Sequence, residues 1–167
     1  MKFSLTMADQ GSVETFGRLI SAVSKICRKH VGLRLRADSI EIQCGDTVHE
    51  GGFWLTVRIM AATAFTTYTF GPWEGKDEFV LEVDMAKLAD VLSSAQGHTK
   101  LKLLNRKTAA GQLIPTLLIE QREAVLVYHI TVDVVPPHKW GSFDRPRFSE
   151  SIVSTESDGG EISIVKR

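Results

Sequence analysis

Apolar and polar residues along the first seventy positions predict a strand, then a helix, then several more strands. In residues 2–7 the two kinds alternate, which is the period of a half-buried strand. In residues 12–29 the apolar residues recur every three or four positions, as in a helix with one buried face, and Ser12 is its expected N-cap. The strands expected after this helix cover residues 31–37, 40–43, 53–60 and 64–70.

The same order of elements begins again at residue 78. A strand over residues 78–83 leads to Asp84, which is expected to cap a helix over residues 85–96. Further strands are expected over residues 100–105, 115–121 and 124–134. Short loops join the strands, so the sheet should be mainly antiparallel. We therefore predict an α+β domain over residues 1–134, with two helices side by side on one face of a single curved sheet.

After residue 134 the pattern changes. Two consecutive prolines, Pro136 and Pro137, remove the backbone donors that a strand ladder needs. Residues 141–160 are rich in Ser, Gly and acidic residues, so residues 135–160 are expected to form a partly flexible interdomain connector. Residues 161–167 resemble a strand without a partner, which is the expected start of a truncated second domain.

The first helix is expected to separate apolar residues from positive charge. Its apolar stripe extends to Ile26, while Arg18, Lys25 and Lys29 fall on the opposite face and Arg28 at its edge. We expect this opposite face to carry only positive charge. Such a face is either ordinary solvated surface or a contact for a polyanion.

Arginines and lysines on the strands have a simpler expected role. Arg34, Arg36, Lys100 and Lys102 should lie on the outward side of the sheet as ordinary surface charge.

Composition limits the classes of function. The 167 residues hold 20 Lys+Arg and 20 Asp+Glu, so a binder of nucleic acid that works by bulk charge is excluded. Nucleic acid could be bound only where the positive charges are gathered on one face. No apolar run approaches the length of a membrane span. Cys27 lies in the apolar stripe and far from Cys44, which predicts reduced core thiols and an intracellular, reducing compartment.

Catalytic and metal-binding patterns are missing from the sequence. The histidines lack the close His/Cys spacing of a zinc site, and no phosphate-binding glycine loop or nucleophile elbow is present. We therefore expect no catalytic residues, no metal and no cofactor. The remaining enzymatic alternative is a site completed by a partner chain.

Four stretches give the chain a resemblance to a known family. They are the opening residues 1–3, residues 93–96 at the end of the second helix, residues 100–103 after it, and above all residues 129–140. Over residues 1 to about 140 the chain resembles the sliding DNA clamps with the PCNA-like fold. It is most similar to the hydroxyurea-sensitive (HUS-type) subunit of the heterotrimeric 9-1-1 checkpoint clamp.

The resemblance implies a nuclear ring of three different subunits around double-stranded DNA, with helices lining the hole. Such a ring has no catalytic activity; a loader opens it, and it recruits checkpoint and repair proteins. Binding of DNA would be independent of sequence. The residues expected to face DNA are Arg18, Lys25, Arg28, Lys29 and Lys87, although Lys87 shares its helix face with Asp90 and Ser94.

Two further surfaces follow from the same resemblance. The strand over residues 124–134 is either a free edge that joins another subunit or an interior strand, and its expected interface residues are Val125, Val127, Tyr128, His129 and Ile130. The connector is expected to form part of a groove for partner peptides, at Ile42, Cys44, Pro136 and Trp140. Alternatively, Trp140 only pins the connector to the sheet. An α+β interaction scaffold without DNA binding remains the competing function.

Overall fold

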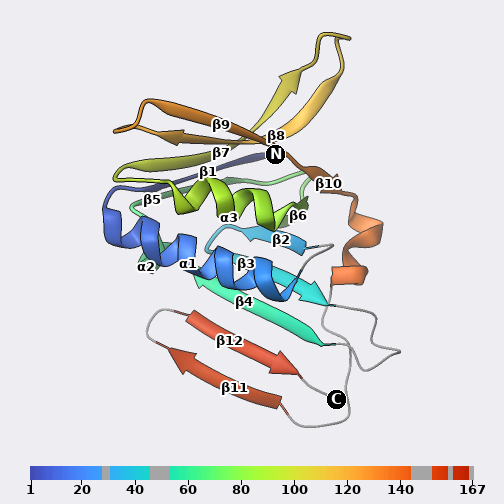
Figure 1. Ribbon diagram of the computed structural model, residues 1–167. Helices are drawn as coiled ribbons and strands as arrows, with labels where there is room; N and C mark the ends of the chain where they lie inside the picture. The colour runs from blue at the N-terminus through green and yellow to red at the C-terminus, as the bar shows by residue number, and fades with distance from the viewer. Residues whose placement is uncertain (28–30, 46–52, 144–151, 158–159, 166–167) are drawn as a thin grey trace.

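The computed structural model describes residues 1–27, 31–45, 53–143, 152–157 and 160–165 (Figure 1). The first repeat consists of β1 (Lys2–Met7), α1 (Gln10–Ile26), β2 (Val31–Arg36), β3 (Ser39–Gly45), β4 (Trp54–Met60), α2 (Ala61–Ala64) and β5 (Thr67–Gly71). The second consists of β6 (Glu78–Val83), α3 (Met85–Ser93), β7 (Thr99–Lys107), β8 (Leu113–Gln121), β9 (Leu126–Thr131) and β10 (Asp133–Val135). A 3-10 helix, η2 (Pro137–Phe143), and the hairpin of β11 (Ile152–Ser157) and β12 (Gly160–Val165) follow.

The predicted α+β class and the doubled order of elements are confirmed, but the strands form two sheets instead of one. The five-stranded sheet has the order β5-β1-β7-β8-β9, and the seven-stranded sheet has the order β10-β6-β2-β3-β4-β12-β11. All pairs are antiparallel. A twisted sheet of more than about ten strands tends to curl or split, which explains the division.

The two repeats exchange their first strands. β1 pairs with β7 of the second repeat, and β6 pairs with β2 of the first. Each sheet therefore contains the same series of five strands, in which β9 of one sheet corresponds to β4 of the other. The two positions differ in one respect: β12 pairs along β4, whereas β9 ends its sheet in the described part of the chain.

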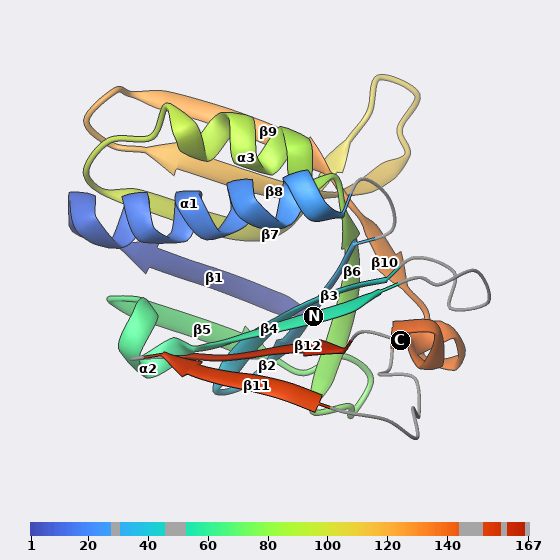
Figure 2. The ribbon, with the colours of Figure 1, turned by 60° about the horizontal axis from the view of Figure 1, so that its bottom comes forward.

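The helices α1 and α3 lie side by side across the sheets in both views (Figures 1 and 2). Gly17 lies against Leu92 of α3: a Cβ at this glycine would stand 3.5 Å from the Leu92 carbonyl oxygen, an ordinary van der Waals contact. The buried faces of the helices join one core with both sheets, and their buried residues are Val13, Phe16, Ile20, Val23, Met85, Leu88, Ala89 and Leu92. Ile26, expected in the apolar stripe, is instead exposed where α1 ends.

The helix caps agree with the sequence in one case and differ in the other. Asp84 caps α3 as predicted, accepting a hydrogen bond from the Lys87 backbone N–H at 3.1 Å that lowers the pKa of its carboxyl. Ser12 is not the cap of α1: Asp9 accepts from the Ser12 hydroxyl at 2.7 Å and from its N–H at 2.8 Å. Both bonds lower the pKa of Asp9. The cap therefore lies three residues earlier than expected.

Two expected boundaries in the second half were wrong. α3 ends at Ser93, before the predicted residue 96. The long strand predicted over residues 124–134 is two strands, β9 and β10, which lie in different sheets. The break is at Val132, whose N–H donates to the carbonyl oxygen of Pro115 at 3.1 Å, and whose side chain is buried in the core.

The C-terminal region also differs from the expectation. Residues 161–165, expected as part of a strand without a partner, lie in β12, which pairs with both β4 and β11. Part of the predicted flexible stretch is regular, since η2 and β11 lie within it, while residues 144–151 and 158–159 are outside the described residues. The division of the chain into a domain, a connector and the start of a second domain stays a prediction.

Cys27 and Cys44 form a disulfide, so the prediction of reduced thiols was wrong. Their Cα atoms are 6.2 Å apart, within the usual range for such a bond. The disulfide links Cys27, the residue that ends α1, to β3 beneath it, and both residues are buried. Across the described residues, no helix combines the length and apolar character needed to cross a bilayer.

Candidate functional site

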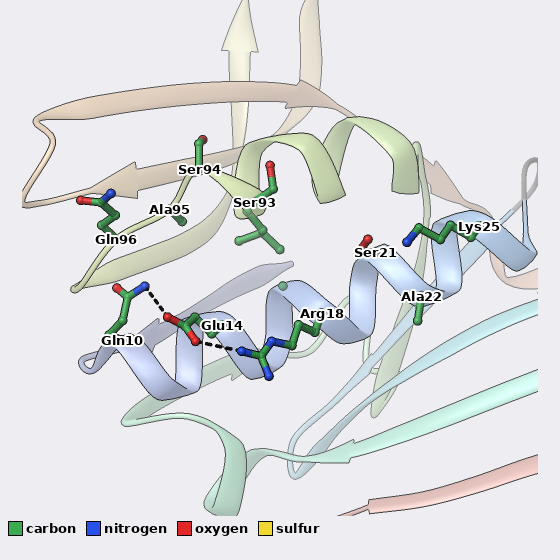
Figure 3. Close-up of a pocket in the computed structure, with 12 residues that line it drawn as sticks. Gln10, Glu14, Arg18, Ser21, Ala22, Lys25, Ser93, Ser94, Ala95 and Gln96 are labelled. Atoms are coloured by element: carbon green, nitrogen blue, oxygen red, sulfur yellow. Dashed lines mark hydrogen bonds and ion pairs between the residues drawn. The ribbon is translucent and has the colours of Figure 1, made fainter.

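A groove of about 700 Å³ runs between α1 and the C-terminal end of α3 on the solvent side of the helix pair (Figure 3). Gly17, Leu92 and Ala95 form its apolar floor. The residues around it are mostly polar: Gln10, Glu14, Arg18, Ser21 and Lys25 from α1, and Ser93, Ser94 and Gln96 from the end of α3. This is the surface on which the DNA-facing residues were expected.

The expectation that α1 presents only positive charge was wrong. Glu14 lies one turn before Arg18, and its carboxylate pairs with the Arg18 guanidinium at 3.2 Å while also accepting a hydrogen bond from Gln10 (Figure 3). The four-residue spacing of Glu14 and Arg18 could have revealed this pair from the sequence. The Arg18 side chain is 80% exposed, and exposed pairs of this kind contribute only about 0.3–0.5 kcal/mol. Arg18 is therefore free to exchange Glu14 for another anion.

The other expected DNA-facing residues differ in their surroundings. Lys87 pairs with Asp84 at 3.1 Å, and Asp90 is exposed on the same helix. Lys25 is exposed and has no ion pair within the described residues. Arg28 and Lys29 lie outside the described residues. Among the described charges of the two helices and their caps, Lys25 is thus the cation best placed to meet an external anion.

The edge strand β9 carries the expected interface residues except Val125, which lies in the turn just before it (Figure 1). In the described part of the chain it pairs only with β8, so the alternative of an interior strand is excluded there. Val125 is 87% exposed and Val127 57% exposed; His129 is also exposed and Tyr128 half-buried. Ile130 does not fit the expectation, because its side chain points into the core.

The connector helix η2 covers part of the outer face of the seven-stranded sheet. The indole N–H of Trp140 donates to the carbonyl oxygen of Val135 at 2.8 Å, and the Trp140 carbonyl accepts a hydrogen bond from Arg34 at 3.4 Å. Phe143 packs against Gly32 of β2. These contacts are those expected of a tryptophan that pins the connector to the sheet.

Arg34 is buried beneath this helix, at 7% exposure, so the expectation of a surface charge was wrong for it. It pairs with Glu78 at 3.4 Å, and Glu78 also pairs with Arg36 at 2.7 Å. Arg36 is half-buried and also bonds Glu41. The carboxylates compensate the charges that the connector and neighbouring side chains remove from water, as buried charges require.

The predicted partner residues divide into surface and core positions. Ile42 is fully buried in the core, which contradicts its assignment to a surface groove. Cys44 is held in the disulfide but borders a small cavity of about 290 Å³, together with Trp54, Glu82, Val135, Lys139 and Phe143. Pro136 and Trp140 are half-buried and follow directly, in the sequence, the cavity-lining residues Val135 and Lys139. The described residues hold no group of three or more His, Cys, Asp or Glu that could bind a metal ion.

Replacing Gly32 with alanine should loosen η2. The new Cβ would collide with the ring of Phe143, so either the ring or the connector must move, and the expected loss in free energy of unfolding is about 1–3 kcal/mol. Urea unfolding and hydrogen exchange over residues 137–143 measure the two effects. Gly141→Ala is the matched control, because no heavy atom of the described residues lies within 4 Å of its Cβ position. Equal stability and exchange in the two variants would contradict this packing.

Comparison with known proteins shows which family and which fold the chain resembles. The sequence profile of the family described as "Hus1-like protein" matches residues 1–155. This chain belongs to the Hus1-like family. The Hus1-like chain is also similar in structure to a chain in the crystal structure of a PCNA2–PCNA3 complex from Sulfolobus tokodaii, with a TM-score of 0.57 and 13% sequence identity. The comparison with curated protein sequences gives no match.

The structural match covers 89% of this Hus1-like chain and 52% of the other, so the chain spans about half the length of that clamp protein. At 13% identity the likeness establishes the PCNA-like fold and nothing beyond it. Both parts of the predicted resemblance, to the HUS-type family and to the PCNA-like fold, are confirmed.

Proposed function

We propose that this chain is a non-catalytic subunit of a heterotrimeric ring that encircles double-stranded DNA, formed with two homologous clamp subunits. The observation that carries the proposal is the pair of helices α1 and α3 on one side of a PCNA-like domain that belongs to the Hus1-like family. In such a ring the helix pair would face the hole. A loader would open the ring, and the ring would recruit checkpoint and repair proteins in the nucleus.

Contact with DNA would be weak and independent of sequence. Lys25 and Arg18 are exposed on the helix pair, and we include Arg28, Lys29 and Lys87 in the same surface. Cations that meet phosphates through water attract a duplex without holding it in one register. The carboxylates of Glu14 and Asp84 beside two of these cations would further weaken the attraction, which suits a ring that must slide.

The joint to a neighbouring subunit would form at β9. Its counterpart in the other repeat, β4, already pairs with an antiparallel strand from Trp54 to Ile59. β9 occupies the equivalent end of the five-stranded sheet, and the exposed side chains of Val127 and His129 lie along it. A bare strand edge with apolar residues is an aggregation hazard unless another strand covers it. A strand added by a neighbouring subunit would pair with the open edge of β9 and would cover its exposed apolar residues.

Recruited proteins would bind on the outer face, beside η2. The small cavity bordered by Cys44, Trp54 and Phe143 has aromatic walls, and Lys139 and Glu82 at its margin could orient a peptide. Pro136 and Trp140 hold the connector that forms one side of this region.

The DNA contact is tested by removing three cations, Arg18→Ala, Lys25→Ala and Lys29→Ala, in the complex purified with its partner subunits. Retention on circular duplex DNA should become less sensitive to salt, with the slope of log K against log salt falling by about 0.9 for each phosphate that the variant no longer neutralises. The control removes Lys76, Lys100 and Lys139, which lie away from the helix pair. An unchanged slope in the first variant, or equal changes in both, would refute the assignment.

A scaffold without DNA binding is the second candidate. It is favoured by the balance of charge on the described helices, where Glu14 and Asp84 pair with Arg18 and Lys87. This function predicts association with other proteins without any dependence on DNA. A chain that binds other proteins, but neither assembles into a ring with homologous clamp subunits nor is retained on circular DNA, would support it.

A further inference from the structure

The hairpin of β7 and β8 projects beyond the sheet that contains it (Figure 1). The two strands pair with each other along their whole length, from Thr99 and Gln121 to Lys107 and Leu113. β1 accompanies β7 only as far as Lys102, and β9 accompanies β8 only over residues 116–121. Residues 103–107 and 113–115 therefore form a two-stranded arm whose outer edges have no strand neighbour among the described residues.

The arm is an ordered ribbon with a defined tip. The Thr108 N–H donates to the Gln112 carbonyl at 2.8 Å, and the Gly111 N–H donates to the Thr108 carbonyl at 2.9 Å. Gly111 has a φ of 83°, a conformation that glycine adopts without strain. The Thr108 hydroxyl also accepts from the Gln112 N–H at 3.1 Å. The tip thus joins the two strands of the arm through a hydrogen-bonded turn.

The charged residues of the arm are all cations. No Asp or Glu occurs between Asp90 and Glu120, while Arg106 and Lys107 are exposed at the end of the arm. Lys102, at the base, pairs with Glu120 at 2.6 Å, but neither Arg106 nor Lys107 has an ion pair within the described residues. Both cations are therefore available to an external anion.

Aliphatic side chains stand beside the two cations. The ladder places Ile114 opposite Arg106 and Leu113 opposite Lys107, so on each face of the ribbon a cation stands beside an aliphatic residue near the tip. Leu113 is 61% exposed, among the large hydrophobic residues most open to water in this chain. A duplex could neutralise the cations but would leave the aliphatic groups and the open strand edge uncovered.

We propose that the β7–β8 arm binds an extended, acidic segment of a partner protein, which adds as a strand along residues 103–107. Its carboxylates lie on one face of the ribbon and meet Arg106 or Lys107. Its alternate apolar residues lie on the opposite face and cover the aliphatic residue there, Leu113 or Ile114. The backbone of the segment satisfies the free edge of β7. The site is distinct from the helix pair, from β9 and from η2, so it does not depend on the ring proposed above.

The experiment uses the chain with a fluorescent synthetic peptide in which Asp or Glu alternates with Val or Leu. Anisotropy should show binding that weakens with salt, and no binding of a peptide in which Lys and Arg replace the acids. The double variant Arg106→Glu and Lys107→Glu should bind at least about tenfold more weakly. Lys76→Glu with Arg122→Glu, which changes the net charge equally at exposed residues away from the arm, should bind as the unchanged chain does.

Hydrogen exchange identifies the binding edge. The peptide should slow exchange of backbone amides within residues 103–107, in the unchanged chain and in the control variant. Three results would overturn the proposal: no peptide binding, binding that survives charge reversal on the arm, or protection confined to another surface. Binding of duplex DNA that depends on the arm, without binding of the peptide, would also overturn the proposal. So would an arm variant that aggregates but binds the peptide normally, because the cations would then only protect the strand edge from aggregation.

Discussion

Removal of the Cys27–Cys44 disulfide should lower the free energy of unfolding by about 3 kcal/mol, the value expected when a bond closes a loop of this size. The two residues are 17 positions apart, so the bond restricts the unfolded chain between α1 and β3. Urea unfolding with and without reductant measures the loss. The double variant Cys27→Ala and Cys44→Ala should lose a similar amount and should no longer respond to reductant.

Counting free thiols provides the decisive control. Denatured without reductant, the unchanged chain should show no reactive thiol, because the structure places both of its cysteines in the bond. Two reactive thiols per chain, together with a free energy of unfolding that does not change with reductant, would contradict the disulfide. The measurement also bears on the proposed nuclear site, where thiols are usually kept reduced. Burial of both cysteines restricts the access of reductants to the sulfur atoms.

Charged residues on β9 should abolish association with neighbouring clamp subunits. Val127→Asp with His129→Glu would bury two unpaired carboxylates in the proposed joint, which should weaken association by at least about a hundredfold. Both positions are exposed in the single chain, so its own fold should persist. Half-buried Tyr128 is left unchanged because it packs against the core.

Size-exclusion chromatography and sedimentation with the homologous subunits measure this effect, and circular dichroism checks the fold. Leu113→Asp is the control, since it places a charge at another exposed apolar residue outside the joint. Normal assembly by the β9 variant would mean that the joint between subunits lies on another surface. Equal loss with the control would mean that association depends on general surface hydrophobicity.

Local patterns anticipated most of the secondary structure. The alternation in β1 and β6 and the helical spacing in α1 and α3 are visible without any partner, because each pattern reflects which face of one element is buried. The cap at Asp84 was also predictable, since its bond to Lys87 spans only three residues. The pairing of Glu14 with Arg18 was equally local, but the prediction considered only the cations.

The wrong predictions of strand boundaries and of side-chain burial had causes far away in the sequence. The stretch from β9 to β10 has continuous strand composition, yet Val132 separates two sheets because each half pairs with a different neighbour. Arg34 alternates as a surface residue would, but η2, more than a hundred residues away, covers it. Ile42 was assigned to a groove through the resemblance to clamps, although its side chain is buried on the core-facing side of β3.

The sequence by itself determined the doubled strand–helix–strands order, the amphipathic character of both helices and the family, because these depend on residues close together in the chain. Only the tertiary structure decided that the strands form two sheets, that Cys27 meets Cys44, and that β12 pairs along β4 while β9 has an open edge among the described residues. Those outcomes depend on which distant segments pair and pack, and many arrangements satisfy the same local pattern. The burial that selects one of them exists only once the whole core has formed.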